Sequence, residues 1–147
     1  MSASRPIYET PEDLKNERDI ADHVSHVWKI SLVKMHLKHY IDFMAFRDGK
    51  AVAVVEARRR FNLANKYPTF FISLAKWNKG IEYFKTNNLE FCLVICWDDG
   101  MQYYKYKDGD DFEIEMGGSQ PWNKSWRGDA QDYEPVIHIP MGRFVRI

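Results

Sequence analysis

Residues 39–58, which read HYIDFMAF-RDGK-AVAVVEAR, decide the fold class of this chain. The first and last eight residues of the stretch are mostly aliphatic, β-branched or aromatic, a composition typical of strands. Asp48-Gly49 between them is a strong short-range signal for a hairpin turn. The stretch therefore predicts two antiparallel strands, 39–46 and 51–58, joined by a tight turn.

Two acids interrupt this apolar hairpin, Asp42 in its first strand and Glu56 in its second. A three-residue loop with Gly49 in the left-handed conformation would pair Phe46 with Lys50. Asp42 and Glu56 would then share one face as diagonal neighbours, about 7–8 Å apart at the backbone. A two-residue Asp-Gly loop shifts the pairing by one residue and puts the two acids on opposite faces. Both faces are rich in apolar residues, so their composition does not decide between the two loops.

Acidic side chains on a mostly apolar sheet repel one another and are costly to bury unless a cation joins them. Their hard oxygen ligands suit Mg²⁺ or Mn²⁺. Arg58 lies two residues beyond Glu56 on the same strand face, where its charge would stabilise a phosphate under attack by an activated water. The pattern favours phosphodiester hydrolysis, and the alternative is a plain ion pair between Glu56 and Arg58 at the end of the strand.

A helix is predicted to begin at Thr10-Pro11-Glu12-Asp13 and to run to about residue 26. Thr is a favoured cap, Pro fits the first turn, and acids suit the positive end of the helix dipole. The apolar stripe of this helix consists of Leu14, Ala21, Val24 and Trp28. Glu17 falls on the stripe, so its carboxylate is expected to face the core or a cleft. The alternative is a Glu at the helix edge that bends outward.

The rest of the chain alternates strand-like and helix-like segments. Further elements are expected as a strand at 27–33, a helix capped by Thr69 and ended by Asn87-Asn88, and strands at 91–97, 101–106 and 135–139. Residues 1–10 are expected to form an arm and residues 107–134 a long loop. Together they predict one α/β domain over residues 1–147, with a mixed sheet of four or five strands flanked by helices. Strand 91–97 should lie parallel to strand 51–58, with the second helix as the crossover.

Composition excludes several classes of protein. The 147 residues carry 21 Lys+Arg against 21 Asp+Glu, and a net charge of zero argues against a histone-like nucleic-acid coat. No apolar run reaches the ~20 residues of a membrane helix, and the N-terminus lacks an apolar signal core, so no membrane association is expected. Two cysteines make no disulfide framework. A cytoplasmic location is the default expectation.

These residues resemble the D…(D/E)xK pattern of the PD-(D/E)XK nuclease superfamily, in particular its small phage-encoded members. Asp42, the hairpin and Glu56-Ala57-Arg58 match the metal-binding motif, and Glu17 matches the acid that such members carry in the preceding helix. The following helix, the next turn and the C-terminal segment also fall in the family's order, at residues 69–77, 97–100 and 127–140. The resemblance covers roughly residues 9–140.

The resemblance implies a restriction-endonuclease-like core and a nuclease that cuts DNA with Mg²⁺ or Mn²⁺. It implies Asp42, Glu56 and Glu17 as catalytic metal ligands, with Arg58 as the charge stabiliser. Arg58 stands where the family has lysine, and a pKa above about 12 excludes arginine from steps that need a neutral amine. Lys76 on the second helix is a candidate substitute, as in some relatives. The alternative function is a catalytically impaired nuclease-fold protein that binds DNA or inhibits a host protein.

Basic residues near the proposed site are expected to bind nucleic acid, unless they only balance acids elsewhere in the chain. They are Lys34, Arg59, Arg60, Lys76 and Lys79. Phosphate contacts from such a patch give affinity without sequence preference. The expected partner is DNA, whether duplex, branched or single-stranded. Because relatives that cut duplexes often dimerise, a homodimer is a further expectation of the resemblance, as is the cytoplasm of a bacterial host.

Overall fold

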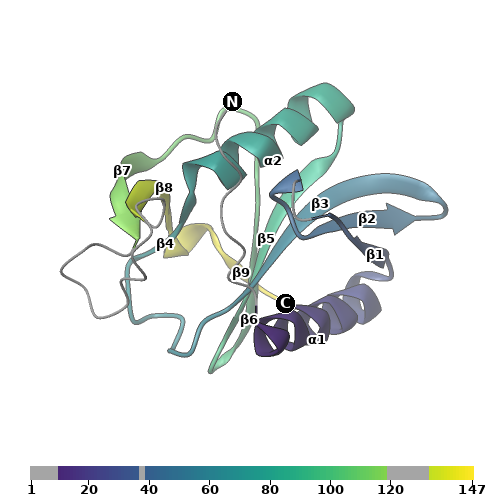
Figure 1. Ribbon diagram of the computed structural model, residues 1–147, viewed down its shortest axis with the longest axis horizontal. Coiled ribbons are helices and arrows are strands. Elements are labelled where there is room, and N and C mark those ends of the chain that lie inside the picture. Colours follow the sequence, from purple (N-terminus) through teal and green to yellow (C-terminus); the bar gives the residue numbers. More distant parts are fainter. Residues whose placement is uncertain (1–9, 37–38, 119–132) are drawn as a thin grey trace.

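The computed structural model describes residues 10–36, 39–118 and 133–147 (Figure 1). Within these residues, a central sheet has six strands in the order β1-β2-β3-β5-β6-β9, and a second sheet has three in the order β4-β8-β7. The central strands are β1 (Ser31–Lys34), β2 (Phe43–Arg47), β3 (Lys50–Arg59), β5 (Glu90–Trp97), β6 (Gly100–Lys105) and β9 (Val145–Arg146). The remaining elements are β4 (Thr69–Ser73), β7 (Glu113–Gly118), β8 (Tyr133–Pro140), α1 (Pro11–Trp28), α2 (Leu74–Asn87) and the short η3 (Met141–Arg143). The predicted α/β class with a mixed sheet is confirmed, but the sheet is wider than expected.

Helix α1 begins as predicted. The Thr10 hydroxyl accepts a hydrogen bond from the Asp13 amide, and the Asp13 carboxylate accepts one from the Thr10 amide, which makes a capping box. The helix continues to Trp28, whose ring packs edge-on against Tyr103 of β6 at 5.1 Å between centroids. Lys29 then ends it in the left-handed conformation, at φ 53°. Because the helix extends past residue 26, the first strand starts at Ser31 and not at residue 27.

The β2–β3 hairpin turns through two residues. Arg47 pairs with Lys50, and Asp48 and Gly49 between them have φ of 51° and 76°. Positive φ at both turn residues is what a type I′ turn requires, which is why Asp-Gly suits it. The three-residue loop considered from the sequence is therefore wrong. Strand β2 also begins later than residue 39, because Tyr40 has a φ of 65° and cannot continue an extended strand.

A β-bulge follows the turn. The pairing shifts between Ala45 and Phe46, which leaves Val52 as an extra residue in β3. One extra residue reverses the face on which every later side chain of that strand lies, relative to its partner. Beyond the bulge, the register puts position 42 opposite position 56. A two-residue turn alone would put Asp42 and Glu56 on opposite faces, and the bulge returns them to the same face.

Strands β3 and β5 run side by side and parallel, as predicted, with Glu56 opposite Leu93. The chain between them passes through β4 and α2, which is the crossover that a parallel pair requires. Strand β5 is a continuous apolar run because it lies in the middle of the sheet with both faces covered. Strand β6 returns antiparallel to β5 at Gly100–Lys105, one residue earlier than expected.

The segment expected to open the second helix begins as a strand. Thr69–Ser73 forms β4, which pairs with β8, and Ser73 caps α2 in place of Thr69. Phe70 and Ile72 are buried by this arrangement, and Thr, Phe and Ile are all strand formers. Phe70 also fits the helical spacing of the apolar residues that follow it. Residues 69–73 form a strand and not the first turn of a helix because they pair with β8, which lies far away in the sequence.

The polar stretch expected as a loop over 107–134 contains part of the second sheet. Strand β7 occupies Glu113–Gly118, and β8 runs over Tyr133–Pro140, longer than the expected 135–139. Residues 119–132 of that stretch, and all of the expected arm except Thr10, lie outside the described residues. Strand β9 was not predicted, and it adds an edge strand beside β6. No helix in the described ranges combines the length and the apolar character needed to cross a bilayer.

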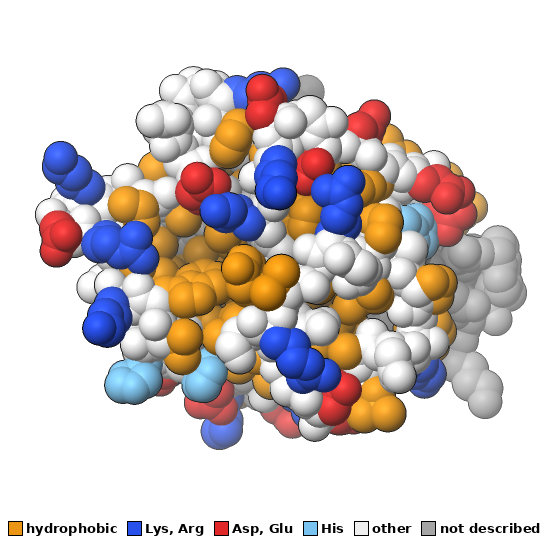
Figure 2. Space-filling view, turned by 180° about the vertical axis from the view of Figure 1, so that it is seen from behind, with side chains coloured by type: hydrophobic (Ala, Val, Ile, Leu, Met, Phe, Trp, Pro, Cys, Tyr) orange, Lys and Arg blue, Asp and Glu red, His pale blue; other side chains and the backbone are white. Residues whose placement is uncertain are grey.

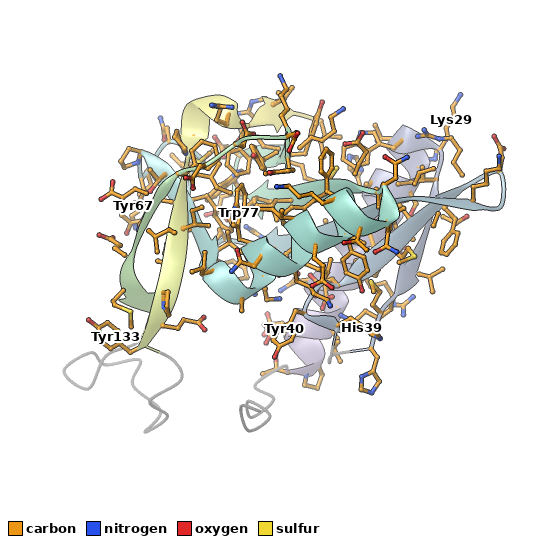
Figure 3. The ribbon with its side chains drawn as sticks, turned by 90° about the horizontal axis from the view of Figure 1, so that it is seen from above. Lys29, His39, Tyr40, Tyr67, Trp77 and Tyr133 are labelled. Carbon is orange, nitrogen blue, oxygen red and sulfur yellow. The ribbon has the colours of Figure 1, made fainter. Side chains whose placement is uncertain are left out.

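Hydrophobic side chains cover both faces of the central sheet. On one face, α1 contributes Ile20, Ala21 and Val24, which pack over β2, β3 and β5. On the other face, α2 and the smaller sheet form a second cluster that includes Trp77. Figure 3 labels Trp77 on α2, where its ring lies 5.9 Å from that of Phe91 between centroids. The two clusters cover β3 from both sides, and β3 carries the buried Glu56.

Candidate active site

Asp42 and Glu56 meet across the β2–β3 pair. Asp42 directly precedes β2, and the register beyond the bulge puts it opposite Glu56. The Asp42 Oδ2 accepts a hydrogen bond of 2.9 Å from the backbone amide of Ala57. This bond ties Asp42 to the strand that carries Glu56, so the two carboxylates are positioned by the backbone of the hairpin.

Glu56 is the most deeply buried acid of the described chain, with only 1% of its surface exposed. Its Oε2 lies 2.8 Å from Lys76 Nζ and 2.9 Å from Arg58 Nη2. Its Oε1 is buried and has no hydrogen-bond partner among the described residues. A buried carboxylate oxygen without a donor is costly, so this atom marks a place where a cation would be favoured.

Glu17 is buried on the inner side of α1, so it does not bend outward as a helix-edge residue would. It accepts a hydrogen bond from Lys34 of β1. The Lys34 ammonium also lies 3.5 Å from Asp42 Oδ1. Glu17 and Asp42 therefore share the Lys34 cation.

Burial and neighbouring charge shift the ionisation of this group. Burial raises the pKa of Asp42, the charge of Lys76 opposes that rise, and the charge of Glu17 adds to it. Burial also raises the pKa of Glu56 against the lowering effects of Arg58 and Lys76. The charge of Glu56 raises the already high pKa of Arg58. Carboxyl groups with perturbed pKa values, surrounded by cations, are typical of functional sites.

The donor set fits a hard divalent cation in part. Asp42 and Glu56 offer carboxylate oxygens from adjacent strands, and one of them, Glu56 Oε1, has no protein donor. Within the described ranges, no three Asp, Glu, His or Cys side chains converge as a ready-made metal cluster. Mg²⁺ commonly takes only one or two carboxylates and completes its shell with water and substrate phosphate. The two carboxylates of Asp42 and Glu56 fall within that number, and Glu17 interacts with Asp42.

The other basic residues named from the sequence are distributed differently around this centre. Arg59 pairs with Asp98 at 2.7 Å, and Lys79 pairs with Glu82 at 3.4 Å. Arg60 lies over the ring of Phe70, 5.1 Å from its centroid. Only Lys34 and Lys76 of that set contact the acids. Figure 2 shows Lys and Arg side chains interspersed with Asp and Glu over the face seen from behind, in keeping with the zero net charge.

Sequence reasoning missed how closely Lys34 is tied to the acids, since it was named only as part of a basic patch. A signal was present in the alternation of β1. Lys34 lies two residues after Leu32, on the strand face that turns toward α1, and both residues line a surface pocket with Glu17. Strand β1 is short because α1 continues to Trp28 and leaves only Ser31–Lys34 for the strand.

Comparisons with known proteins identify a family for this chain. Residues 3–147 match the family described as "Phage putative PDDEXK endonuclease". The search of curated proteins finds no match. A similar solved structure is that of Hjc, a Holliday junction resolvase from Archaeoglobus fulgidus, at 13% sequence identity and a TM-score of 0.47. The similarity covers 63% of this chain and 70% of that chain.

The family match extends over nearly the whole sequence and includes every acid of the site. The hairpin, the crossover helix and the parallel β3–β5 pair also form the PD-(D/E)XK core that the sequence predicts. The chain therefore belongs to the phage PDDEXK endonuclease family.

Proposed function

We propose that this protein is a divalent-metal-dependent endonuclease that hydrolyses DNA phosphodiester bonds. The observation that carries the proposal is the unpartnered, buried Oε1 of Glu56 across the β2–β3 pair from Asp42. These two carboxylates would hold Mg²⁺ or Mn²⁺, with Glu17 near them through Lys34. When bound there, such an ion supplies Lewis-acid polarisation of the phosphate and lowers the pKa of water.

Arg58 is suited to bind the phosphate. Its guanidinium lies 2.9 Å from Glu56, and 38% of its side chain is exposed, so it can contact Glu56 and a substrate from outside. A planar guanidinium matches phosphate oxygens well and keeps its charge at any accessible pH. Arg58 therefore stabilises negative charge on the phosphate but cannot exchange a proton with the attacking water.

Lys76 is suited to orient the attacking water. Its ammonium reaches the same Glu56 oxygen as Arg58, but from α2. A lysine ammonium is a compact donor with three rotatable N–H groups, whereas the guanidinium is a rigid planar fork, so Lys76 can aim a hydrogen bond at a water while it stays paired with Glu56. We propose that Lys76 Nζ orients the water that attacks the phosphate, in place of the lysine that is absent from position 58.

A second candidate function is DNA binding without cleavage, or inhibition of a host protein. Lys34, Lys76 and Arg58 already neutralise the three acids in this structure. If these ion pairs persist in solution, they compete with a metal ion for the same oxygens. A protein of this kind would keep the fold and its affinity for DNA while losing hydrolysis.

The test is cleavage of supercoiled, single-stranded and branched DNA with Mg²⁺, with Mn²⁺ and with a chelator. Wild type is compared with Glu56→Gln, Arg58→Lys and, as a matched control, Glu113→Gln at an exposed acid of β7. We expect cutting that needs the metal, disappears in Glu56→Gln and persists in the control. Cutting by Arg58→Lys alone would support the non-cleaving binder, and chelator-resistant cutting would exclude the proposed mechanism.

The expected partners follow from the same proposal. DNA is the substrate, and a phage enzyme that acts on DNA would work in the cytoplasm of the bacterial host. A homodimer stays a prediction. Sedimentation of the free protein and of its DNA complex would determine the number of chains in each.

A further inference from the structure

The loop between β3 and β4, residues 60–68, combines cations with exposed apolar side chains. From Arg58 to Pro68 the chain carries four basic residues and no acid, in the sequence RRRFNLANKYP. Phe61, Leu63 and Tyr67 are 69%, 52% and 58% exposed. Single exposed apolar residues are ordinary, but three of them on one short basic loop are not.

The loop is held firmly at its start, middle and end. The Arg60 amide donates to the Cys96 carbonyl at 3.0 Å, and the Ala64 amide donates to Asp99 Oδ1 at 3.0 Å. At its end, the Pro68 carbonyl accepts from the Met141 amide at 2.9 Å. Ala64 is buried, and its neighbour Leu63 faces out. The exposure of the large side chains is thus imposed by the backbone.

The ring of Phe61 packs against Arg59, whose own position is fixed by an ion pair. The Arg59 guanidinium lies 4.3 Å from the centroid of its ring, and Arg59 is itself held by Asp98 at 2.7 Å. The ring is nevertheless 69% exposed. An aromatic ring that is fixed from behind and open in front is preorganised to stack on another flat group.

Two cations of the loop have no acidic partner among the described residues. Arg60 contacts the ring of Phe70, and Lys66 lies 5.4 Å from the centroid of the Tyr67 ring. Burial and the charge of Arg58 lower the pKa of Arg60 to about 10, so it still carries its charge at neutral pH. Neither cation forms an ion pair with a described acid, although the charge of Glu56 acts on Arg60, so both can contact an anion from outside.

We propose that the 60–68 loop binds unpaired nucleotides of a DNA substrate, with Phe61 and Tyr67 stacking on bases and Arg60 and Lys66 contacting phosphates. Alternating aromatic and basic residues are the combination that single-stranded DNA binding requires. Arg60 at the start of the loop lies close enough to Arg58 and Glu56 for their charges to shift its pKa, so a strand bound to the loop would begin beside the proposed catalytic centre. Figure 3 shows Tyr67 at the outer surface, at the end of the molecule where β4 and β8 lie.

The inference concerns the substrate class and rests on the proposed nuclease function. Bases in an intact duplex are stacked on one another, so their flat faces cannot meet Phe61 or Tyr67. A gap, a fork or a branch point offers such a face without first breaking a duplex. The loop thus selects DNA that contains unpaired bases next to the bond to be cut.

The test measures binding, without metal, of a duplex and of the same duplex with a short gap. The fluorescent base 2-aminopurine in the gap reports stacking directly, because aromatic side chains quench it. Variants are Phe61→Ala and Tyr67→Ala, with Phe71→Ala as the matched control. Phe71 is an aromatic residue of β4, 43% exposed, outside the loop. Each variant is first checked for an unchanged melting temperature.

We expect wild type to prefer gapped DNA and to quench the probe. Each loop variant should lose about fivefold or more in affinity for gapped DNA, keep its duplex affinity, and restore the probe fluorescence. Equal binding of both DNAs by wild type, or loop variants that behave as Phe71→Ala does, would overturn the inference while leaving the nuclease proposal intact. Metal-dependent cleavage of the gapped DNA by wild type, measured in parallel, keeps the two questions separate, because loss of cleavage with gapped DNA still bound and the probe still quenched counts against the nuclease alone.

Discussion

Lys76 Nζ of α2 lies 2.8 Å from Oε2 of Glu56 in β3, so the first turn of the crossover helix is fastened to the buried acid at the centre of the sheet. The pair exists because Thr69–Ser73 forms a strand and the helix starts only at Leu74. A helix starting at Thr69 would give Lys76 a different position along its axis. The start of α2 at Leu74, and not at Thr69, is therefore also what brings this lysine to the site.

Lys76→Met should impair both stability and cleavage. It removes one of two cations from a buried carboxylate, which should lower the free energy of unfolding by about 1–3 kcal/mol, less than full loss of a buried pair because Arg58 remains. Cleavage should fall at least tenfold if Lys76 orients the attacking water. Lys79→Met is the matched control, since Lys79 pairs with the exposed Glu82. Urea unfolding and plasmid nicking measure the two effects, and equal behaviour of both variants would argue against a role for Lys76.

Mn²⁺ should stabilise the folded protein. An ion that binds only the native state adds about 2.7 kcal/mol when its concentration is a hundredfold above its Kd. We expect the melting temperature to rise with Mn²⁺ in wild type and to stay constant in Asp42→Asn and Glu56→Gln. The readout does not depend on catalysis. A rise of the same size in both variants would show that the ion binds elsewhere.

The contribution of Asp42 and Glu56 to stability should decrease as the pH rises through the acidic range. Burial raises the pKa of Asp42 and of Glu56 above their ordinary values of 3.8 and 4.5. The folded state therefore holds these protons more tightly than the unfolded state, so ionisation costs stability from the ordinary values up to the raised ones. Metal affinity should change in the opposite direction, because ligands must be deprotonated. Unfolding free energies of wild type and Glu56→Gln at several pH values isolate the contribution of Glu56, because wild type should lose stability relative to the variant as the pH rises through this range.

Gly80→Ala should destabilise the protein although alanine favours helices. A Cβ at Gly80 would lie 2.3 Å from the ring of Phe91, which is fully buried and has no room to move. Overpacking of this kind costs about 1–3 kcal/mol, more than the ~1 kcal/mol that alanine contributes to a helix. Gly142→Ala is the control, because no atom lies within 4 Å of its Cβ position. Thermal unfolding compares the two, and a Gly80→Ala protein at least as stable as wild type would contradict the packing seen here.

The sequence predicted the features that depend on neighbouring residues. Thr10 and Asp13 lie three positions apart, so their capping box can be read directly. Asp-Gly between two apolar runs predicts a hairpin for the same local reason. The parallel β3–β5 pair followed from a helix-length connection, which leaves few other topologies.

The tertiary structure decided the features that depend on distant partners. Whether Thr69–Ser73 becomes strand or helix is determined by β8, whose pairing residues lie 63 to 71 positions away. Whether Asp42 faces Glu56 depends on an extra residue at Val52, which alternation of apolar residues on both faces cannot reveal. The sequence by itself thus determined the fold class and indicated the candidate acids, because the signals for both are local. The strand register and the ion pairs that join these acids depend on packing between segments far apart in the chain.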